Sequence, residues 1–122
     1  MKRLVSFFEI PSSDFKRAVK FYETIFDISM PSFECEHEKM AFFPNEDELC
    51  PGAISWAEDF LPSQNGVLIS LNCDDMEATL SKIKACGGKV VIPKTKIEAE
   101  NRGYFCIFAD SEGNHIGLHC DK

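Results

Sequence analysis

The chain has 122 residues, with 13 Lys and Arg against 20 Asp and Glu, a net charge of −7 and 44% hydrophobic residues. These values predict one folded domain over residues 1–122 and exclude a disordered chain, which combines low hydrophobicity with high charge. The acidic balance, without a basic patch, excludes nucleic acid and anionic membranes as expected partners. We expect a cytoplasmic protein, since there is no signal-like segment and no apolar run of about 18 residues.

The six cysteines lie at positions 35, 50, 73, 86, 106 and 120 and form no Cys-x-x-Cys pair. This spacing gives no sign of a zinc ribbon or of a redox motif. We therefore predict reduced thiols, most of them buried in the core.

The first half of the chain predicts a strand, a helix and three more strands. Residues 3–10 are rich in apolar and β-branched side chains, and Pro11 ends this strand. Asp14 offers an N-cap, and helical apolar spacing over residues 15–26 predicts an amphipathic helix. Further strands are expected at residues 30–36, 39–43 and 52–57, before a turn-rich connector at 59–66.

The second half predicts the same order of elements. Residues 67–73 form an apolar strand, and Asp74 with Glu77 has the spacing of a capping box for the next helix, with Asp75 beside it. Gly87 and Gly88 end this helix. Strands follow at 89–92, 104–108 and 115–120, and a turn at 110–114 joins the last two. The polar segment 95–103 is either an ordinary exposed loop or a flap over a cleft.

A shift of 61 residues brings the two halves into register. It aligns Asp14 with Asp75, so that the two expected helix starts coincide, and it keeps apolar positions together. Such a pattern is typical of a diverged internal duplication. The sequence therefore predicts two βαβββ modules, residues 1–61 and 62–122.

Three segments carry a family resemblance. Residues 8–23, 72–75 and 103–118, the last with its Asp-Ser-Glu-Gly-Asn turn, resemble the first strand and helix, the second module's start and the final hairpin of the vicinal oxygen chelate superfamily. Glyoxalase I, bleomycin resistance proteins and extradiol dioxygenases belong to it. The resemblance implies an α+β fold in which the two modules curl into an open sheet around a cleft, and it implies a homodimer.

The resemblance also implies positions for metal ligands, and this sequence departs from the family there. The ligand positions correspond to Phe7, Leu68, Gly117 and a residue in 52–54, none of which offers a donor side chain. We therefore expect no conventional metal and no other cofactor. A displaced metal site made of Glu9, His115 and His119 is a weaker alternative.

Strand alternation then selects the candidate site residues. In the family the ligand positions face the cleft, and alternate residues of a strand point to the same side. Glu9 therefore faces the cleft with Phe7, and Ser70 and Asn72 face it with Leu68. On the last strand, His115 and His119 share the face of Gly117. We predict Glu9 and His119 as catalytic residues. The predicted ligand-binding residues are Phe7, Trp56, Leu68, Ser70, Asn72 and His115.

Two functions follow from the resemblance and stay open at this point. In the first, the protein is a glyoxalase-related enzyme without a metal, in which Glu9 moves a proton on a small carbonyl compound. In the second, it is a non-catalytic protein of the bleomycin-resistance type that sequesters a small molecule in its cleft. A ferredoxin-like interaction module fits less well, because three strand candidates follow each helix.

Overall fold

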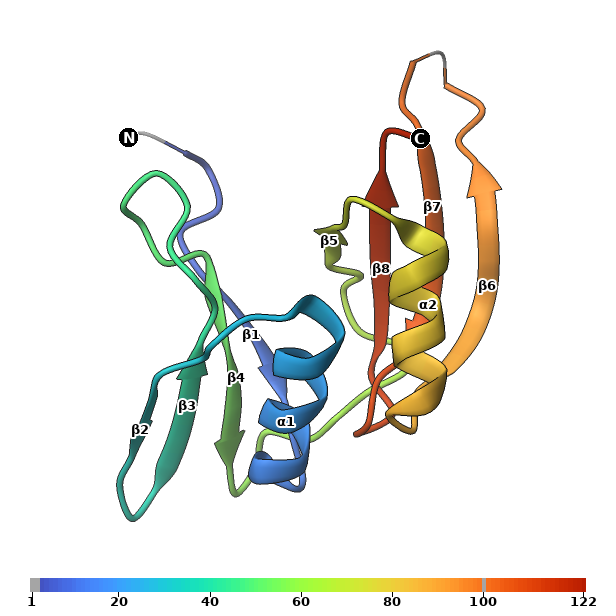
Figure 1. The fold of residues 1–122 in the computed structure, drawn as a ribbon. Helices are drawn as coiled ribbons and strands as arrows, with labels where there is room; N and C mark the ends of the chain where they lie inside the picture. Colours follow the sequence, from blue (N-terminus) through green and yellow to red (C-terminus); the bar gives the residue numbers. More distant parts are fainter. Residues whose placement is uncertain (1–2, 100) are drawn as a thin grey trace.

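A computed structural model describes residues 3–99 and 101–122. These described residues form two four-stranded sheets and two helices (Figure 1). The first half contains β1 (Phe8–Pro11), α1 (Phe15–Phe26), β2 (Ser32–Glu34), β3 (Glu38–Phe42) and β4 (Gly52–Ala57). The second half contains β5 (Ser70–Asn72), α2 (Met76–Ala85), β6 (Lys89–Lys96), β7 (Tyr104–Ala109) and β8 (His115–Cys120). The predicted α+β class and the βαβββ order are confirmed.

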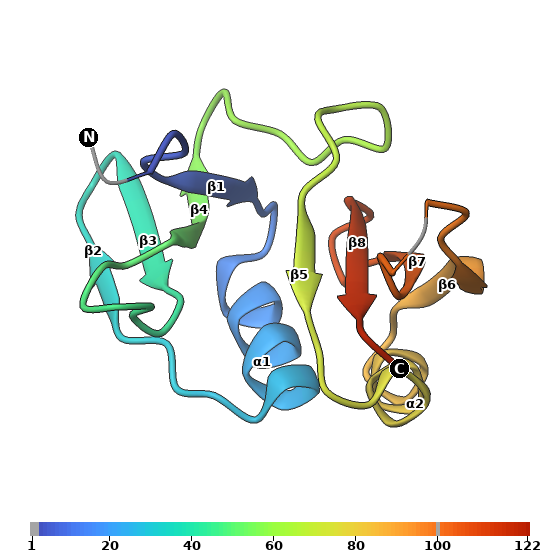
Figure 2. The ribbon, with the colours of Figure 1, turned by 90° about the horizontal axis from the view of Figure 1, so that it is seen from above.

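The two sheets have the same topology. Their strand orders are β1-β4-β3-β2 and β5-β8-β7-β6, and in each the first strand runs parallel to its neighbour while the other pairs are antiparallel. Both helices lie on one side of the sheets, and no strand of one sheet pairs with the other among the described residues (Figure 2). β1 and β5 therefore each keep an unpaired edge. Neither helix is long and apolar enough to cross a membrane in the part of the chain described.

Each helix begins at an aspartate cap. The Asp14 carboxylate accepts a hydrogen bond from the Arg17 N–H, and the Asp75 carboxylate accepts one from the Ala78 N–H. These bonds satisfy N–H groups that have no partner within the helix. The two caps lie 61 positions apart, as the sequence comparison predicts. The predicted capping box on Asp74 is wrong, because the chain enters the helix one residue later.

Four strands differ from the prediction by two or more residues at an end. β2 covers only Ser32–Glu34 of the predicted residues 30–36. β1 and β5 are shorter than residues 3–10 and 67–73, because each has only one neighbour and pairs with it over four and three residues respectively. β6 is longer than residues 89–92 and extends to Lys96 through two irregularities in its pairing with β7. Thr95 and Lys96, the start of the predicted loop or flap, are therefore part of a strand. Residue 100 of that segment lies outside the described residues.

Helix α1 joins the two halves into one core. Its buried Ala18, Tyr22 and Ile25 belong to the same cluster as Ile10 of β1. The Phe21 ring lies 6.2 Å from that of Phe108 in β7. Burial of such side chains is the main stabilising contribution to folding. The core thus crosses the boundary between the halves and fixes their relative placement.

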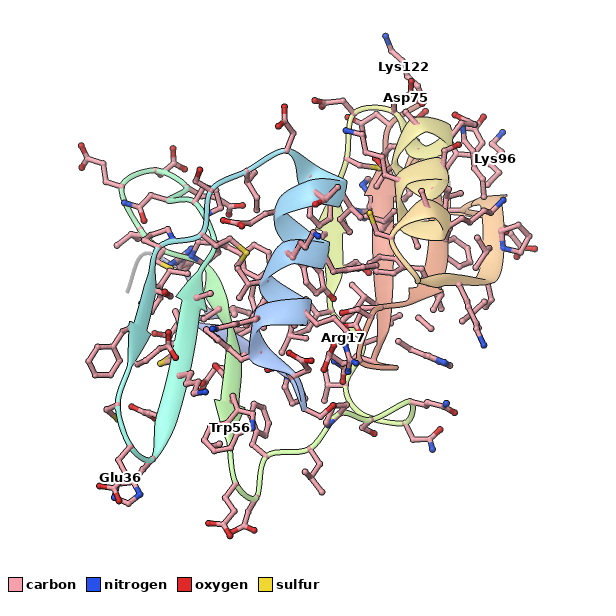
Figure 3. The ribbon with its side chains drawn as sticks, turned by 60° about the horizontal axis from the view of Figure 1, so that its bottom comes forward. Arg17, Glu36, Trp56, Asp75, Lys96 and Lys122 are labelled. Atoms are coloured by element: carbon pink, nitrogen blue, oxygen red, sulfur yellow. The ribbon has the colours of Figure 1, made fainter. Side chains whose placement is uncertain are left out.

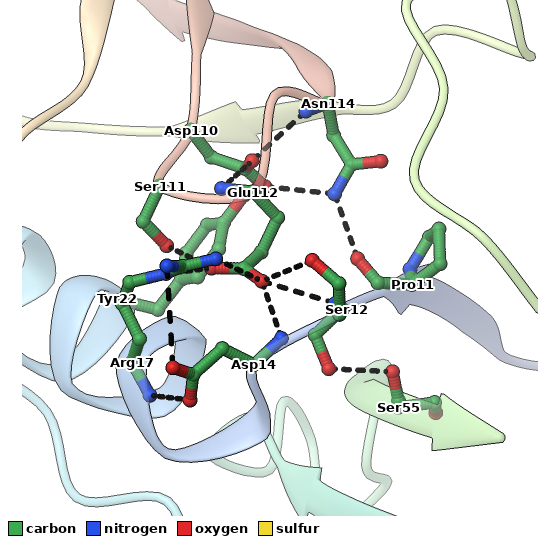
Figure 4. Close-up of polar contacts among 11 residues, drawn as sticks. Pro11, Ser12, Asp14, Arg17, Tyr22, Ser55, Asp110, Ser111, Glu112 and Asn114 are labelled. Carbon is green, nitrogen blue, oxygen red and sulfur yellow. Dashed lines mark hydrogen bonds and ion pairs between the residues drawn. The ribbon is translucent and has the colours of Figure 1, made fainter. Parts of the chain in front are cut away.

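Besides the apolar core, a polar cluster at the β7–β8 turn also connects the two halves (Figure 4). The buried Asp110 carboxylate accepts hydrogen bonds from the Tyr22 hydroxyl (2.7 Å) and from the Asn114 side-chain amide (3.0 Å). Asn114 also donates to the Pro11 carbonyl (2.8 Å) and accepts from the Ser63 N–H (3.0 Å). One turn of the second half thereby fixes β1, α1 and the connector.

Candidate functional site

A carboxylate and a hydroxyl form a pair on the first sheet. The Ser55 hydroxyl donates a 2.8 Å hydrogen bond to Glu9 Oε1. Ser55 is buried, and its carbonyl accepts bonds from the Ser12 N–H (2.8 Å) and the Ser12 hydroxyl (2.9 Å). The donor therefore sits on a fixed backbone and orients the carboxylate. Glu9 Oε2 takes no hydrogen bond from the described residues and is free to meet a ligand.

Apolar side chains flank this pair. Glu9 pairs with Ala53 of β4, which pairs with Phe42 of β3, so these residues share one face. The Phe7 ring lies 6.5 Å from that of Phe42, which places Phe7 on it too. We call this surface, defined by Phe7, Glu9, Phe42 and Ser55, the Glu9 face. It lies opposite the sheet face whose Ile10 packs in the core with α1.

The second sheet presents its own row of candidate residues. Ser70 pairs with Gly117 and Asn72 with His119 across the parallel strands β5 and β8, so these side chains share a face with His115. A Cβ atom at Gly117 would collide with the Ser70 hydroxyl and lie 3.2 Å from the Ser70 Cβ. Glycine at 117 therefore makes room for Ser70, at a position where the resemblance implies a metal-binding side chain.

The structure does not gather all the predicted residues at one point. Glu9 and His115 line a cavity of about 220 Å³ beside the connector, whereas Ser70 and Asn72 line another of about 620 Å³. The His119 ring Nε2 lies 2.5 Å from the Arg102 carbonyl, within hydrogen-bonding distance. His119 thus contacts the segment between β6 and β7.

Two of the predicted ligand-binding residues, Trp56 and Leu68, are not part of the Glu9 face. Trp56 neighbours Ser55 in β4 and so points to the opposite face, where Lys39 Nζ lies 5.3 Å from its ring centroid. It lies near the end of β4 that leads to the connector (Figure 3). Leu68 precedes β5 and is 48% exposed. Their roles in binding stay predictions.

The donor set does not fit a resident divalent metal. Phe7, Leu68 and Gly117, and the residues of 52–54, carry no metal-binding side chain. Among residues 3–99 and 101–122, no three His, Cys, Asp or Glu side chains lie close enough to hold a metal ion. The alternative of a displaced site made of Glu9, His115 and His119 is therefore wrong for this arrangement, because the three do not converge.

Sequence reasoning missed Ser55, and the reason is topological. The contact with Glu9 joins residues 46 positions apart and depends on the parallel pairing of β1 with β4. Alternation along β4 gives a partial signal, since it places Ser55 on the same face as Ala53. Only the pairing register brings that face to Glu9.

The paired βαβββ units, with equal strand orders and one helix each, define a class of small α+β proteins made of two such modules. A family model described as the Glyoxalase/Bleomycin resistance protein/Dioxygenase superfamily matches residues 4–118. The chain belongs to this superfamily, as its resemblance to the vicinal oxygen chelate proteins implies.

One relative and three solved structures illustrate the similarity. A glyoxylase-like domain-containing protein of Didymella fabae is 29% identical over 115 residues, covering 90% of this chain and 88% of its own. A maize glyoxalase I variant has a TM-score of 0.75 at 15% identity. A glyoxylase/bleomycin resistance protein/dioxygenase domain from Frankia sp. has a TM-score of 0.75 at 12% identity, covering both chains fully. A fosfomycin resistance protein of Listeria monocytogenes has a TM-score of 0.70 at 18% identity, covering 100% of this chain and 93% of its own.

The lengths of these proteins differ. The match to maize glyoxalase I covers 94% of the present chain but only 45% of the maize chain. At identities below 20%, the structural neighbours show the fold alone.

Proposed function

We propose that the protein binds a small organic molecule on the Glu9 face and that Glu9 acts there as a general base without a metal. The observation that carries this proposal is the bond between the Ser55 hydroxyl and Glu9 Oε1, which leaves Oε2 unoccupied. A general base needs a fixed position within hydrogen-bond reach of the proton that it removes. Ser55 supplies the fixed position, and the open sheet face supplies the access.

The surroundings suit a small ligand. Phe7 and Phe42 offer apolar contact beside the carboxylate, and ligand sites usually combine apolar walls with a few fixed polar groups. A carbonyl compound lying on Phe42 would bring the proton next to its carbonyl group toward Glu9. We infer proton abstraction or transfer at this carbon as the reaction class, and His119 stays a candidate second proton carrier.

A sequestering protein is the second candidate, and one observation favours it. Glu9 is exposed in the single chain, so nothing in the described chain excludes water from its carboxylate. Binding alone does not need a water-free site, whereas efficient proton abstraction gains from one. The neighbours include a glyoxalase I and a fosfomycin resistance protein, so the fold by itself does not select one of the two candidate functions.

Proton exchange separates the two functions. A panel of small α-hydroxyketones, dissolved in deuterated water with a chelator, is followed by NMR for loss of the proton next to the carbonyl. If Glu9 is the base, the protein catalyses exchange, and Glu9→Gln lowers the rate by about 10²–10⁴-fold with binding retained. The matched control Glu36→Gln alters an exposed carboxylate on the β2–β3 hairpin and should leave the rate unchanged (Figure 3).

Three results would contradict the metal-free enzymatic proposal. Exchange at the wild-type rate in Glu9→Gln removes this residue from the mechanism. Binding of a ligand without exchange, weakened by Glu9→Gln, supports sequestration instead. Exchange that stops when the chelator is added points to a metal-dependent reaction and contradicts the metal-free mechanism.

A further inference from the structure

A second cavity lies between the halves, away from the Glu9 face. Its volume is about 620 Å³, within the usual range for sites that hold small molecules. One wall comes from the first half and includes Phe8, Phe26 and Phe43. Phe8 and Glu9 are consecutive in β1 and point to opposite faces, so this cavity and the Glu9 face lie on different sides of the strand.

The first wall is aromatic. The Phe8 and Phe43 rings lie 5.5 Å apart and tilted by 40°, and the Phe26 ring stacks on Tyr22 at 6.3 Å. Phe8 and Phe26 are only partly buried. Their rings therefore offer both an apolar surface and faces of negative electrostatic potential, to which cations are attracted.

The opposite wall offers backbone hydrogen-bonding groups at the free edge of β5. Two backbone bonds join the residues that flank β5 to β8: the Gly117 N–H donates to the Ile69 carbonyl, and the Cys73 N–H donates to the His119 carbonyl. In a parallel pair, alternate residues bond to the neighbouring strand. The backbone groups of Ser70 and Asn72 therefore point to the free edge of β5, where both residues line the cavity. Their carbonyl oxygens and N–H groups are both open to a ligand there, and the carbonyl oxygens can accept a hydrogen bond from a cationic group.

The charges around the cavity are mostly negative. Glu46, Asp74 and Asp75 line it, against Lys82 alone among basic residues. Asp75 is occupied as the cap of α2, whereas Asp74 and Glu46 make no side-chain hydrogen bond or ion pair with the described residues. Aromatic faces, carbonyl oxygens and free carboxylates are together the groups that bind an ammonium with an apolar body.

We propose that this cavity between the modules is a second binding site, which takes a small organic cation with an aromatic or apolar body. The apolar body lies against Phe8, Phe26 and Phe43, and the ammonium group lies toward Asp74 and the carbonyl edge of β5. The site does not depend on Glu9, so it goes beyond the function proposed above. It gives the protein a ligand site on the helix side of its sheets.

Phenethylammonium is a suitable probe, with phenethyl alcohol as its neutral analogue and hydrocinnamate as its anionic one. Amide NMR spectra of the whole protein should show the cation perturbing residues 43–46 and 70–74. We expect the alcohol to bind more weakly and the anion to bind most weakly. Phenethylammonium shifts confined to residues around Glu9 and His115 would overturn the proposal, as would binding of the anion equal to that of the cation.

Three variants test the location. Ala78 is exposed in the first turn of α2 and lines the cavity, so Ala78→Trp should fill it and weaken phenethylammonium binding at least about tenfold. Asp74→Asn removes one screened charge and should weaken binding by about 2–5-fold. The control Glu58→Gln changes an exposed carboxylate two residues beyond Trp56, and Figure 3 shows Trp56 far from Asp75. This control should leave phenethylammonium binding unchanged.

The unfolding transition of each variant checks that it is folded, and Glu9→Gln keeps the two proposals apart. Phenethylammonium binding should be unchanged in Glu9→Gln, even if proton exchange is lost. Unchanged binding in folded Ala78→Trp, or no detectable binding at millimolar concentrations, overturns the second site.

Discussion

Arg17 Nε donates a 2.8 Å hydrogen bond to Glu112 Oε2, which makes an ion pair between the first helix and the last hairpin. Glu112 Oε1 also accepts bonds from the Ser13 and Asp14 N–H groups, at 3.0 and 2.7 Å, just before the helix begins. A carboxylate at this end of a helix is favoured, because the helix dipole is positive there. The second half of the chain thus helps to cap the helix of the first.

The two carboxylates of this turn have opposite pKa shifts. Burial alone raises the pKa of Glu112, but the bonds from Arg17, Asp14, Ser111 and Ser13 outweigh it and lower the pKa from 4.5 to about 2. At Asp110, burial is the largest effect and raises the pKa, and the bonds from Tyr22 and Asn114 offset it only in part. Ionisation of Glu112 therefore favours the folded state, while ionisation of Asp110 opposes it.

Glu112→Gln should lower the free energy of unfolding in a pH-dependent way. The Glu112 pKa is depressed on folding, so its contribution is full above about pH 4.5 and lost as the pH falls toward 2. Since Arg17 is 54% exposed and screened, we expect about 1–2 kcal/mol at neutral pH. Urea unfolding of both proteins across this range measures the difference, and Glu36→Gln is the control. If the free energies of unfolding of the wild type and Glu112→Gln still differ by the same amount at pH 2–3, the effect does not come from ionisation of Glu112.

Gly117→Ala should destabilise the protein through Ser70. The added methyl group meets the Ser70 hydroxyl and its Cβ, and overpacking of this kind costs about 1–3 kcal/mol. Ser70→Ala alone should change the free energy of unfolding by less than about 0.5 kcal/mol, because Ser70 is exposed. The double variant should recover part of the loss, with a coupling above about 0.5 kcal/mol. Strictly additive changes in urea unfolding would rule out the contact.

The cysteines should differ in their reaction with iodoacetamide. Burial is the largest effect at Cys73 and Cys106 and raises the pKa of each thiol to about 11, whereas Cys35 is exposed. The thiolate is the reactive form, so near pH 8 Cys35 should be alkylated at least about tenfold faster. Peptide mass spectrometry of timed samples measures the rates. The half-buried Cys73 and the buried Cys106 should be alkylated faster as the pH rises toward 11. Equal rates for Cys35 and these two thiols near pH 8 would refute the assignment.

We also expect a homodimer, in which a second chain packs on the exposed apolar side chains beside Glu9 and leaves the Glu9 carboxylate accessible to a ligand. Phe33 pairs with Met40 and therefore lies on this face, where it is 50% exposed, and Phe7 is 37% exposed. Exposed apolar side chains that share one face indicate an interaction surface. Sedimentation velocity should show a dimer, and Phe33→Glu should weaken association. The control Leu61→Glu changes an exposed apolar side chain of the connector, and a monomeric wild-type protein would contradict the expectation.

Local signals in the sequence were sufficient to predict the helices and strands and the side to which each of their residues points. Helical spacing placed α1 at residues 15–26, and alternation placed His115 and His119 on one side of the last strand, as the structure has them. The boundaries missed by two or more residues belong to β1 and β2 in the first sheet and to β5 and β6 in the second. All four are edge strands, whose length depends on the one neighbour that they pair with more than on their own residues.

Contacts across the chain were decided by the tertiary structure alone. Ser55 reaches Glu9 over 46 positions and Glu112 reaches Arg17 over 95, and no periodicity encodes such pairs. The same holds for the separation of Glu9 from Ser70 and Asn72 into two cavities. By itself the sequence determined the modules, the acidic balance and the missing metal donors, because these follow from residue types and short-range order. Which side chains meet was decided by sheet register and by the packing of α1 between the halves, because these depend on the whole chain.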